Sequence, residues 1–256
     1  IDTISRNTRP PRQESNQMHR NPYASSNAFA GAPALAEAWE RATFIRKTYL
    51  HLGLAILAFT GLECALMVSP LPDMMMKMLS VSGYAWLAVL GVFMLVGWMA
   101  RAFACSEQPL SMQYIGLGLY VVAQAIIFVP LLTYAIRFSN PDVLPTAAVL
   151  TLTLFAGLTG VVLVTRKDFS FLRSLLMVGG FVAIGLIICS VVFGFNLGIV
   201  FSGAMVLLAA GAILYTTSKV LHDYGLNQYV GAALELFAAV ALLFWYVLRI
   251  VMALRR

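Results

Sequence analysis

Two glutamates stand inside stretches that are otherwise apolar and long enough to cross a membrane. Glu63 interrupts the run 48–72, and Glu235 interrupts the run 224–248. A charged side chain at the centre of a membrane helix costs about 3 kcal/mol on insertion scales, so such residues usually face a protein interior. They can bind a proton or a cation there, or serve as structural hydrogen-bonding groups. Glu63 and Glu235 are therefore our candidate ion or proton site.

The two carboxylates are not expected to act as a pair. Glu63 belongs to the outer half of its helix, whereas Glu235 belongs to the inner half of the last one. With a rise of 1.5 Å per residue, the two side chains are offset by roughly 15 Å along the membrane normal. They cannot share one proton directly.

Hydroxyl side chains close the apolar stretch that precedes Glu235. They are Tyr215, Thr216, Thr217 and Ser218. Hydroxyls at a helix end often bond back to carbonyls of the preceding turn, which is the structural interpretation. The functional alternative is a polar inner vestibule around Glu235. The carboxylate would then accept hydrogen bonds from the hydroxyls or pair with basic side chains of the inner loops.

A further acid lies in the inner connection TRKDFSFLR, residues 165–173. Asp168 would act there as a latch between loops, in a group with Arg166, Lys167 and His222. The alternative is an N-cap for the next helix, because Asp168 comes just before Phe169 and Ser170.

The sequence contains no pattern typical of a metal site or of an enzyme active site. The three cysteines, Cys64, Cys105 and Cys189, and the three histidines, His19, His51 and His222, are scattered without ligand-like spacing. Signatures of hydrolases, zinc peptidases and P-loop enzymes are absent. We predict no bound metal, no cofactor and no enzymatic activity.

Composition sets the architecture that must position these residues. Hydrophobic residues make up 61% of the 256 residues and charged residues 11%, against about a quarter charged in soluble domains. A membrane crossing needs about 20 apolar residues, so the uncharged run 174–218 must fold back on itself. Gly194-Phe195-Asn196 is its turn-like point. The sequence thus predicts an all-α integral membrane protein with a seven-helix domain over residues 48–254. Its helices are expected at about 48–69, 82–100, 111–136, 144–164, 172–193, 197–218 and 230–249.

The segments outside these helices have distinct compositions. Residues 1–33 are rich in Asn, Ser, Pro and Arg and predict a disordered cytoplasmic tail. Residues 34–47 carry apolar side chains at helical spacing and predict an amphipathic helix at the membrane interface. The segment 69–79, SPLPDMMMKML, is predicted to be an outer loop at the membrane surface.

Basic residues predict the orientation in the membrane. With the amino terminus inside, the inner segments hold twelve of the 17 lysines and arginines and the outer segments hold five. The positive-inside rule therefore favours a cytoplasmic amino terminus. The net charge of +6 reflects this inner excess and contact with the lipid bilayer. We find no arrangement that predicts binding to nucleic acid.

Four stretches together resemble the Bax inhibitor-1 family, also called the transmembrane Bax-inhibitor-motif family. They are FIRKTYLHLGLAI, TRKDFSFL, ILYTTSKVLH and ALELFAAVALLFWYVLRI, in this order along residues 44–252. The resemblance implies seven helices with the seventh at the centre, surrounded by the first six. Ser218 to His222, followed by Tyr229-Val230, is most similar to the bacterial branch that modulates a membrane protease. That branch implies a bacterial inner membrane location.

The resemblance implies two alternative roles. One is regulation by contact with a membrane-anchored AAA protease or another membrane partner, and the other is a pH-sensitive calcium or cation leak. Leak-type members carry a pair of acids at positions that correspond here to Thr216 and Ala239. Glu235 and Asp168 still match the family pattern. Because the acid pair is missing, the sequence favours the contact regulator over the calcium leak.

Overall fold

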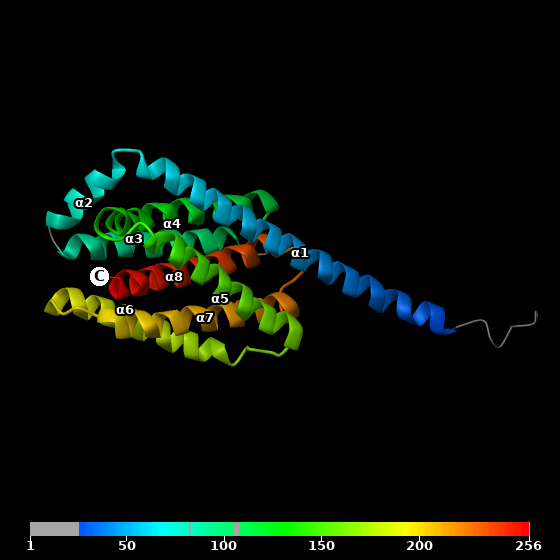
Figure 1. The fold of residues 1–256 in the computed structure, drawn as a ribbon. Coiled ribbons are helices and arrows are strands. Elements are labelled where there is room, and N and C mark those ends of the chain that lie inside the picture. The colour runs from blue at the N-terminus through cyan, green and yellow to red at the C-terminus, as the bar shows by residue number, and fades with distance from the viewer. Residues whose placement is uncertain (1–25, 82, 105–107, 256) are drawn as a thin grey trace, which may run out of the picture. The chain divides into compact units, whose positions relative to one another are not determined.

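A computed structural model of the chain describes residues 26–81, 83–104 and 108–255 (Figure 1). The chain divides into two compact units, Ile1–Trp39 and Glu40–Arg256. The predicted tail, residues 1–33, lies outside the described residues as far as residue 25. A helix begins at Ser26 and contains both residues 26–33 and the predicted interfacial segment 34–47. The position of that segment at a membrane surface stays a prediction.

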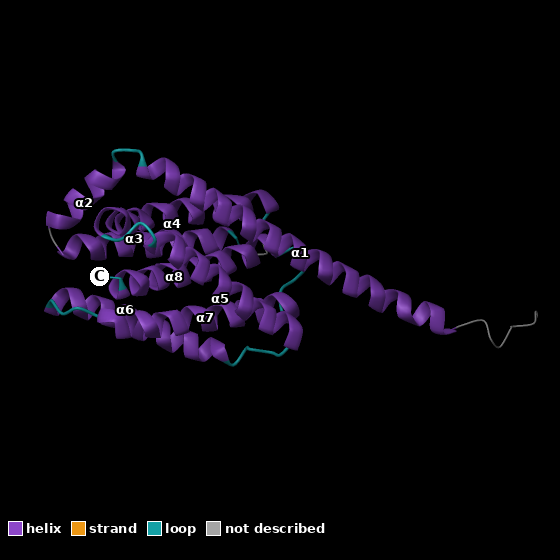
Figure 2. Ribbon diagram, viewed as in Figure 1, coloured by secondary structure: helices purple, strands orange, loops and turns teal. Residues whose placement is uncertain are grey.

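The described part of the chain is helical, with turns and short loops and no strand (Figure 2). Its eight helices are α1 (Ser26–Met67), α2 (Leu71–Val81), α3 (Gly83–Phe103), α4 (Leu110–Phe138), α5 (Val143–Thr165), α6 (Leu172–Phe193), α7 (Gly198–His222) and α8 (Tyr229–Leu254). Seven of them are long and apolar enough to cross a membrane, namely all except α2. The prediction of seven membrane helices is confirmed.

The segment 69–79 differs from the expected loop, because α2 occupies most of it. The Ser69 hydroxyl accepts a hydrogen bond from the backbone N–H of Leu71 at 3.2 Å, which caps the first turn. Pro72 and Met75 are buried, so one side of this short helix packs against the protein. The predicted surface turn is therefore an 11-residue helix that contacts α3 and α4.

The reversal between α6 and α7 lies where the sequence predicts it. Gly194 has φ +71° and ends α6, and Gly198 has φ +64° and begins α7. This left-handed conformation is readily adopted by glycine because it has no Cβ. The long apolar run is thereby divided into two membrane helices.

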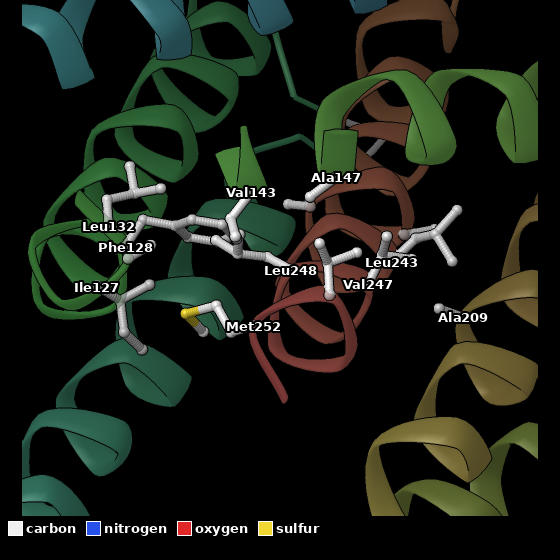
Figure 3. Packing of buried hydrophobic residues seen from close by; sticks show 14 of the residues in the cluster. Ile127, Phe128, Leu132, Val143, Ala147, Ala209, Leu243, Val247, Leu248 and Met252 are labelled. Atoms are coloured by element: carbon white, nitrogen blue, oxygen red, sulfur yellow. The ribbon is translucent and has the colours of Figure 1, made fainter. Parts of the chain in front are cut away.

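Helix α8 has buried residues along most of its length and packs against α4, α5 and α7. Figure 3 shows side chains of α8 meeting those of α4, α5 and α7 in one apolar cluster. A second cluster, nearer the start of α8, joins Val230 and Leu234 to Phe44 and Leu52 of α1.

Large apolar side chains remain exposed on the outer faces of several helices. Phe181 of α6 is 72% exposed, and Val200 and Leu207 of α7 are 83% and 75% exposed. Apolar faces of this extent are unfavourable in water and are compatible with a hydrocarbon environment. Together with the seven spans, they identify an integral membrane protein.

Two glycines allow the end of α3 to approach its neighbours closely. A Cβ on Gly116 of α4 would lie 2.6 Å from the carbonyl oxygen of Ala100, and a Cβ on Gly231 of α8 would lie 2.6 Å from that of Ala104. Real Cβ atoms do not approach so near, so these positions require glycine. The first turn of α8 therefore lies directly on the last turn of α3.

Arg166 ends α5 in a conformation that glycine adopts more readily. Its φ is +50°, and its backbone N–H donates to the carbonyl of Val162 at 2.8 Å. A non-glycine residue in this region carries a penalty of about 1 kcal/mol. We expect Arg166→Gly to raise the free energy of unfolding by up to about 1 kcal/mol in thermal denaturation of the purified protein. Lys167→Gly is the control, and an equal gain there would contradict this reason.

Candidate functional site

The predicted inner end of the α7–α8 hairpin holds an ion pair at Glu235. The Lys219 Nζ lies 3.3 Å from the Glu235 Oε2, with the two side chains 24% and 37% exposed. Lys219 is in the last turn of α7 and Glu235 in the second turn of α8. Glu235 was expected either to accept hydrogen bonds from the hydroxyls of α7 or to pair with a basic side chain. In the structure it pairs with a basic side chain, Lys219.

Aromatic rings surround the same ammonium group. The Lys219 Nζ donates to the hydroxyl oxygen of Tyr224 at 3.3 Å and lies 4.6 Å from the centre of that ring. It also lies 5.5 Å from the ring centre of Tyr215. Cation–π attraction strengthens when the charge is withdrawn from water, so these rings help to hold Lys219 beside Glu235.

Tyr224 completes this group from the α7–α8 connection. Burial raises the pKa of its phenol, the negative charge of Glu235 and a hydrogen bond to Glu235 raise it further, and Arg101 partly opposes the rise. The phenol therefore stays protonated and remains a donor near neutral pH. Lys219, Tyr224 and Glu235 form a polar triad, the name used here for these three residues.

Helix α1 secures the connection that carries Tyr224. The Arg41 guanidinium donates to the backbone carbonyl oxygens of Tyr224 and His222, the latter at 3.0 Å. It also lies 5.6 Å from the ring centre of Phe44. Arg41 thus donates hydrogen bonds to two backbone carbonyl oxygens at and just after the end of α7, which accept no hydrogen bond from within the helix.

Asp168 forms a separate contact between the α5–α6 connection and α7. It accepts hydrogen bonds from the backbone N–H of Ser170 at 2.8 Å and from the Ser170 hydroxyl at 2.9 Å. The Ser218 hydroxyl accepts from the backbone N–H of Phe169 at 3.0 Å and lies 3.4 Å from the Asp168 carboxylate. The acid therefore orders its own turn and joins it to the end of α7.

The partners of Asp168 differ from those expected, apart from His222. In the described residues it makes no ion pair with Arg166 or Lys167, and the N-cap of α6 is Phe171. His222 is the member of the expected group that interacts with it, by charge. Hydrogen bonds from Ser170 to Asp168, backbone first, lower the pKa of its carboxyl, with smaller contributions from Ser218 and His222.

The lowered pKa of Asp168 predicts an acid-sensitive contact. Because the folded state favours the carboxylate, its stabilisation is fully present above the reference pKa of 3.8 and is lost as the pH falls through the lowered value. We expect Asp168→Asn to remove this contribution, leaving proteolysis of the 166–171 connection independent of pH between 5 and 3. Asp223→Asn, which removes an exposed carboxylate that makes no side-chain hydrogen bond to any described residue, should keep the wild-type profile. Equal pH profiles for all three proteins would contradict the assignment.

The four hydroxyls of α7 point to different neighbours. The Tyr215 ring contacts Lys219 and the Ser218 hydroxyl contacts the Asp168 turn. Thr216 and Thr217 are 5% and 0% exposed, and Thr217 lies near Tyr49 of α1. Successive helical residues are 100° apart, which explains why these four do not gather around Glu235.

Glu63 lies near the predicted outer end of α1, whereas the triad lies at the predicted inner end of α7 and α8. It is 5% exposed, and neither carboxylate oxygen has a hydrogen-bond partner in the described residues. Phe59 and Met67, one helical turn before and after it, pack against the cluster of Figure 3. Glu63 therefore shares no contact with Glu235.

Sequence reasoning missed three members of the inner site, namely Lys219 as the partner of Glu235, Tyr224 and Arg41. A signal for the first was present, because a lysine and a glutamate flank a short connection between two antiparallel helices. Arg41 and Tyr224 are 183 residues apart in sequence, and no local pattern links them.

The positions of the missing acid pair are inside the protein. Thr216 is 5% exposed and Ala239 is 6% exposed. Neither side chain ionises near neutral pH, and Glu235 is the one acid within α7 and α8. In the described residues, no group of three or more metal-binding side chains is present.

The fold and the site define an integral membrane protein of seven apolar helices with an ion-paired polar end. The chain belongs to the Bax inhibitor-1 family, because the family's sequence model, described as "Inhibitor of apoptosis-promoting Bax1", matches residues 41–256. An uncharacterized protein of Pseudomonas aeruginosa is 29% identical over 230 residues, covering 85% of this chain and 92% of the relative. "Modulator of FtsH protease YccA" of Escherichia coli K12 is 27% identical over 198 residues, covering 76% and 83%. "Inner membrane protein YccA" of Escherichia coli O6:H1 gives the same values.

Proposed function

We propose that this protein is a non-enzymatic regulator that acts by contact with a membrane-anchored AAA protease. It would lie in a bacterial inner membrane with its amino terminus in the cytoplasm. The observation that carries the proposal is the Lys219–Glu235 pair at 3.3 Å, which neutralises the one acid within helices α7 and α8. The similarity to a modulator of FtsH supports the class of partner.

The alternative, a calcium leak, has less support at this end of the protein. Calcium takes six to eight oxygen ligands, usually with several carboxylates. Glu235 is held by an ammonium group, while Thr216 and Ala239 supply no carboxylate. A fixed ion pair favours a surface that is recognised over a site that binds and releases a cation.

We further infer that α8 is the central helix of the seven. Its contacts with α4, α5 and α7, and its shared cluster with α1 and α3, support this arrangement. A central α8 would make the triad a part of the packed bundle, so that its geometry is kept when a partner binds.

The proposed contact includes the amino-terminal segment 1–33, of which residues 26–33 form the start of α1. Before α1, residues 1–25 are rich in Asn, Ser, Pro and Arg, a composition typical of unfolded segments that proteins with a central pore can engage. The folded inner end would then position the tail relative to the protease.

Affinity purification of the tagged full chain from membranes that contain the AAA protease FtsH tests the proposal. We expect the protease to co-purify, and replacement of residues 2–33 by a Gly/Ser segment of equal length to abolish this association. A variant with residues 2–33 in scrambled order keeps length and composition, so it separates sequence recognition from mere accessibility. Unchanged co-purification with the Gly/Ser segment would count against the role of the tail. Failure of the wild-type chain to associate would remove the proposed partner.

Calcium flux into liposomes separates the two candidate functions. We expect no flux above that of empty vesicles at any pH from 5 to 8. A flux in the wild-type protein that Glu235→Gln reduces would instead establish the leak.

A further inference from the structure

A cleft lies between helices at the predicted outer half of the bundle. It has a volume of about 300 Å³ and is lined by residues of α3, α4, α6 and α8 and of the turn at 195–197. Its apolar wall includes Trp86 and Trp245, whose rings stack with centres 5.9 Å apart. This volume is within the range of small-molecule sites.

Arg249 of α8 is the cation of this cleft. Its side chain is half-buried and makes no ion pair with any carboxylate in the described residues. Two other outer arginines differ, because Arg137 pairs with Asp73 at 2.7 Å and Arg255 lies 4.0 Å from Asp142. A guanidinium that is partly withdrawn from water gains stability from an anion, and no carboxylate of the described residues provides one to Arg249.

The first turn of α7 adds positive potential beside Arg249. Gly198, Ile199 and Ser202 line an adjoining cavity of about 420 Å³ that Arg249 also lines. No side chain caps the start of α7, so the first backbone N–H groups of α7 donate no hydrogen bond to a capping side chain. A guanidinium and an uncapped helix terminus at one place together favour an anionic group.

The cleft lining includes a polar side chain without a hydrogen-bond partner among the described residues. Gln124 lines the cleft, is 6% exposed and makes no hydrogen bond to the described residues. Buried amides in proteins are almost always hydrogen-bonded, to protein or to ordered water. The Gln124 amide therefore offers a hydrogen-bonding group to a molecule that enters the cleft.

The apolar surroundings select the kind of anion. Along the cleft, the side chains between Arg249 and Gln124 are mainly aromatic and aliphatic, such as Leu90, Leu242 and Trp245. The membrane faces of α3 and α6 continue this apolar surface, with Leu95 and Val182 more than half exposed. A molecule that matches both the cationic end at Arg249 and the apolar wall of the cleft has an anionic head and an apolar chain.

We propose that this cleft binds an anionic phospholipid of the surrounding bilayer, with its phosphate at Arg249 and an acyl chain along the wall formed by Trp86 and Trp245. The site is at the opposite end of α8 from the triad and does not depend on the proposed function. Burial of each methylene group favours binding by the hydrophobic effect, and Arg249 selects the charge of the head.

Tryptophan fluorescence provides a direct test, because the chain has four tryptophans. Trp39 and Trp98 are 77% and 69% exposed, so the full chain with W39F/W98F keeps the stacked pair of the cleft as its fluorophores. The probes are phosphatidylglycerol and phosphatidylcholine, each brominated on one acyl chain, added to protein in mixed lipid micelles. We expect the anionic lipid to quench with about fivefold higher apparent affinity, the factor that one cation near an anionic head contributes.

Charge variants identify the residue responsible. Arg249→Gln should remove the preference, Arg249→Lys should retain it, and Arg255→Gln, a change of the same charge near the same end, should leave it unchanged. Loss of preference in both Arg249→Gln and Arg249→Lys, with circular dichroism unchanged, would overturn the role of charge. Equal quenching by the two lipids in the wild-type background, or displacement of the quencher by free glycerol phosphate at equal concentration, would overturn the assignment to lipid.

Discussion

Replacing Gly116 by valine is expected to lower the free energy of unfolding by about 3 kcal/mol, because overpacking a close helix contact strains both backbones. A Cβ at this position would lie 2.6 Å from the carbonyl oxygen of Ala100 and 3.0 Å from the backbone nitrogen of Ala104. These are backbone atoms of α3, so no side-chain rotation can relieve the overlap. The helices α3 and α4 must separate, and the contact of Ala104 with Gly231 of α8 would be disturbed with them.

Gly118→Val is the matched control for this substitution. Gly118 lies on the same helix two residues later, and a Cβ there would meet nothing within 4 Å. The measurement is the thermal unfolding midpoint of the two variants and the wild type in the same detergent. Equal midpoints for Gly116→Val and Gly118→Val would show that α3 and α4 are not in close contact.

Glu235→Lys is expected to destabilise the inner end by about 2 kcal/mol, less than for a fully buried pair because both side chains are partly exposed. The substitution removes the carboxylate 3.3 Å from Lys219 and puts a second ammonium group in its place. Tyr224 would also lose the acceptor that its phenol contacts. Arg101 already acts on Tyr224 by charge, so the new cation enters a positive region.

The charge swap K219E/E235K tests whether the pair itself is responsible. We expect the double variant to recover more than half of the lost stability, giving a favourable coupling in a double-mutant cycle. Asp73→Lys serves as the comparison, because its pair with Arg137 is shorter, at 2.7 Å, but its side chains are 48% and 61% exposed. We expect a loss there of about 0.5 kcal/mol. A loss at Asp73 equal to that at Glu235, or no recovery in the swap, would refute the importance of the triad.

The triad and the cleft at Arg249 lie toward opposite ends of α8. Variants of Glu235 are expected to leave the lipid preference unchanged, and variants of Arg249 to leave protease association unchanged. The two proposals can therefore fail separately.

The sequence by itself determined the seven membrane helices and the reversal at Gly194. Each of these follows from a local property, because a bilayer requires about 20 apolar residues per crossing and a tight reversal favours glycine. It also determined the family, since the matching stretches lie in order along the chain. Helix α2 was missed, because its short run of methionines and leucines is equally compatible with a surface turn.

Only the tertiary structure decided the partners of the polar side chains. Glu235 meets Lys219 rather than the hydroxyls of α7, Asp168 meets Ser170 and Ser218 rather than its neighbouring cations, and Arg249 has no acid at all in the described residues. The physical reason is that helix rotation and the close contacts at Gly116 and Gly231 set which faces meet. Those contacts join residues far apart in the chain, and no periodicity within one helix contains that information.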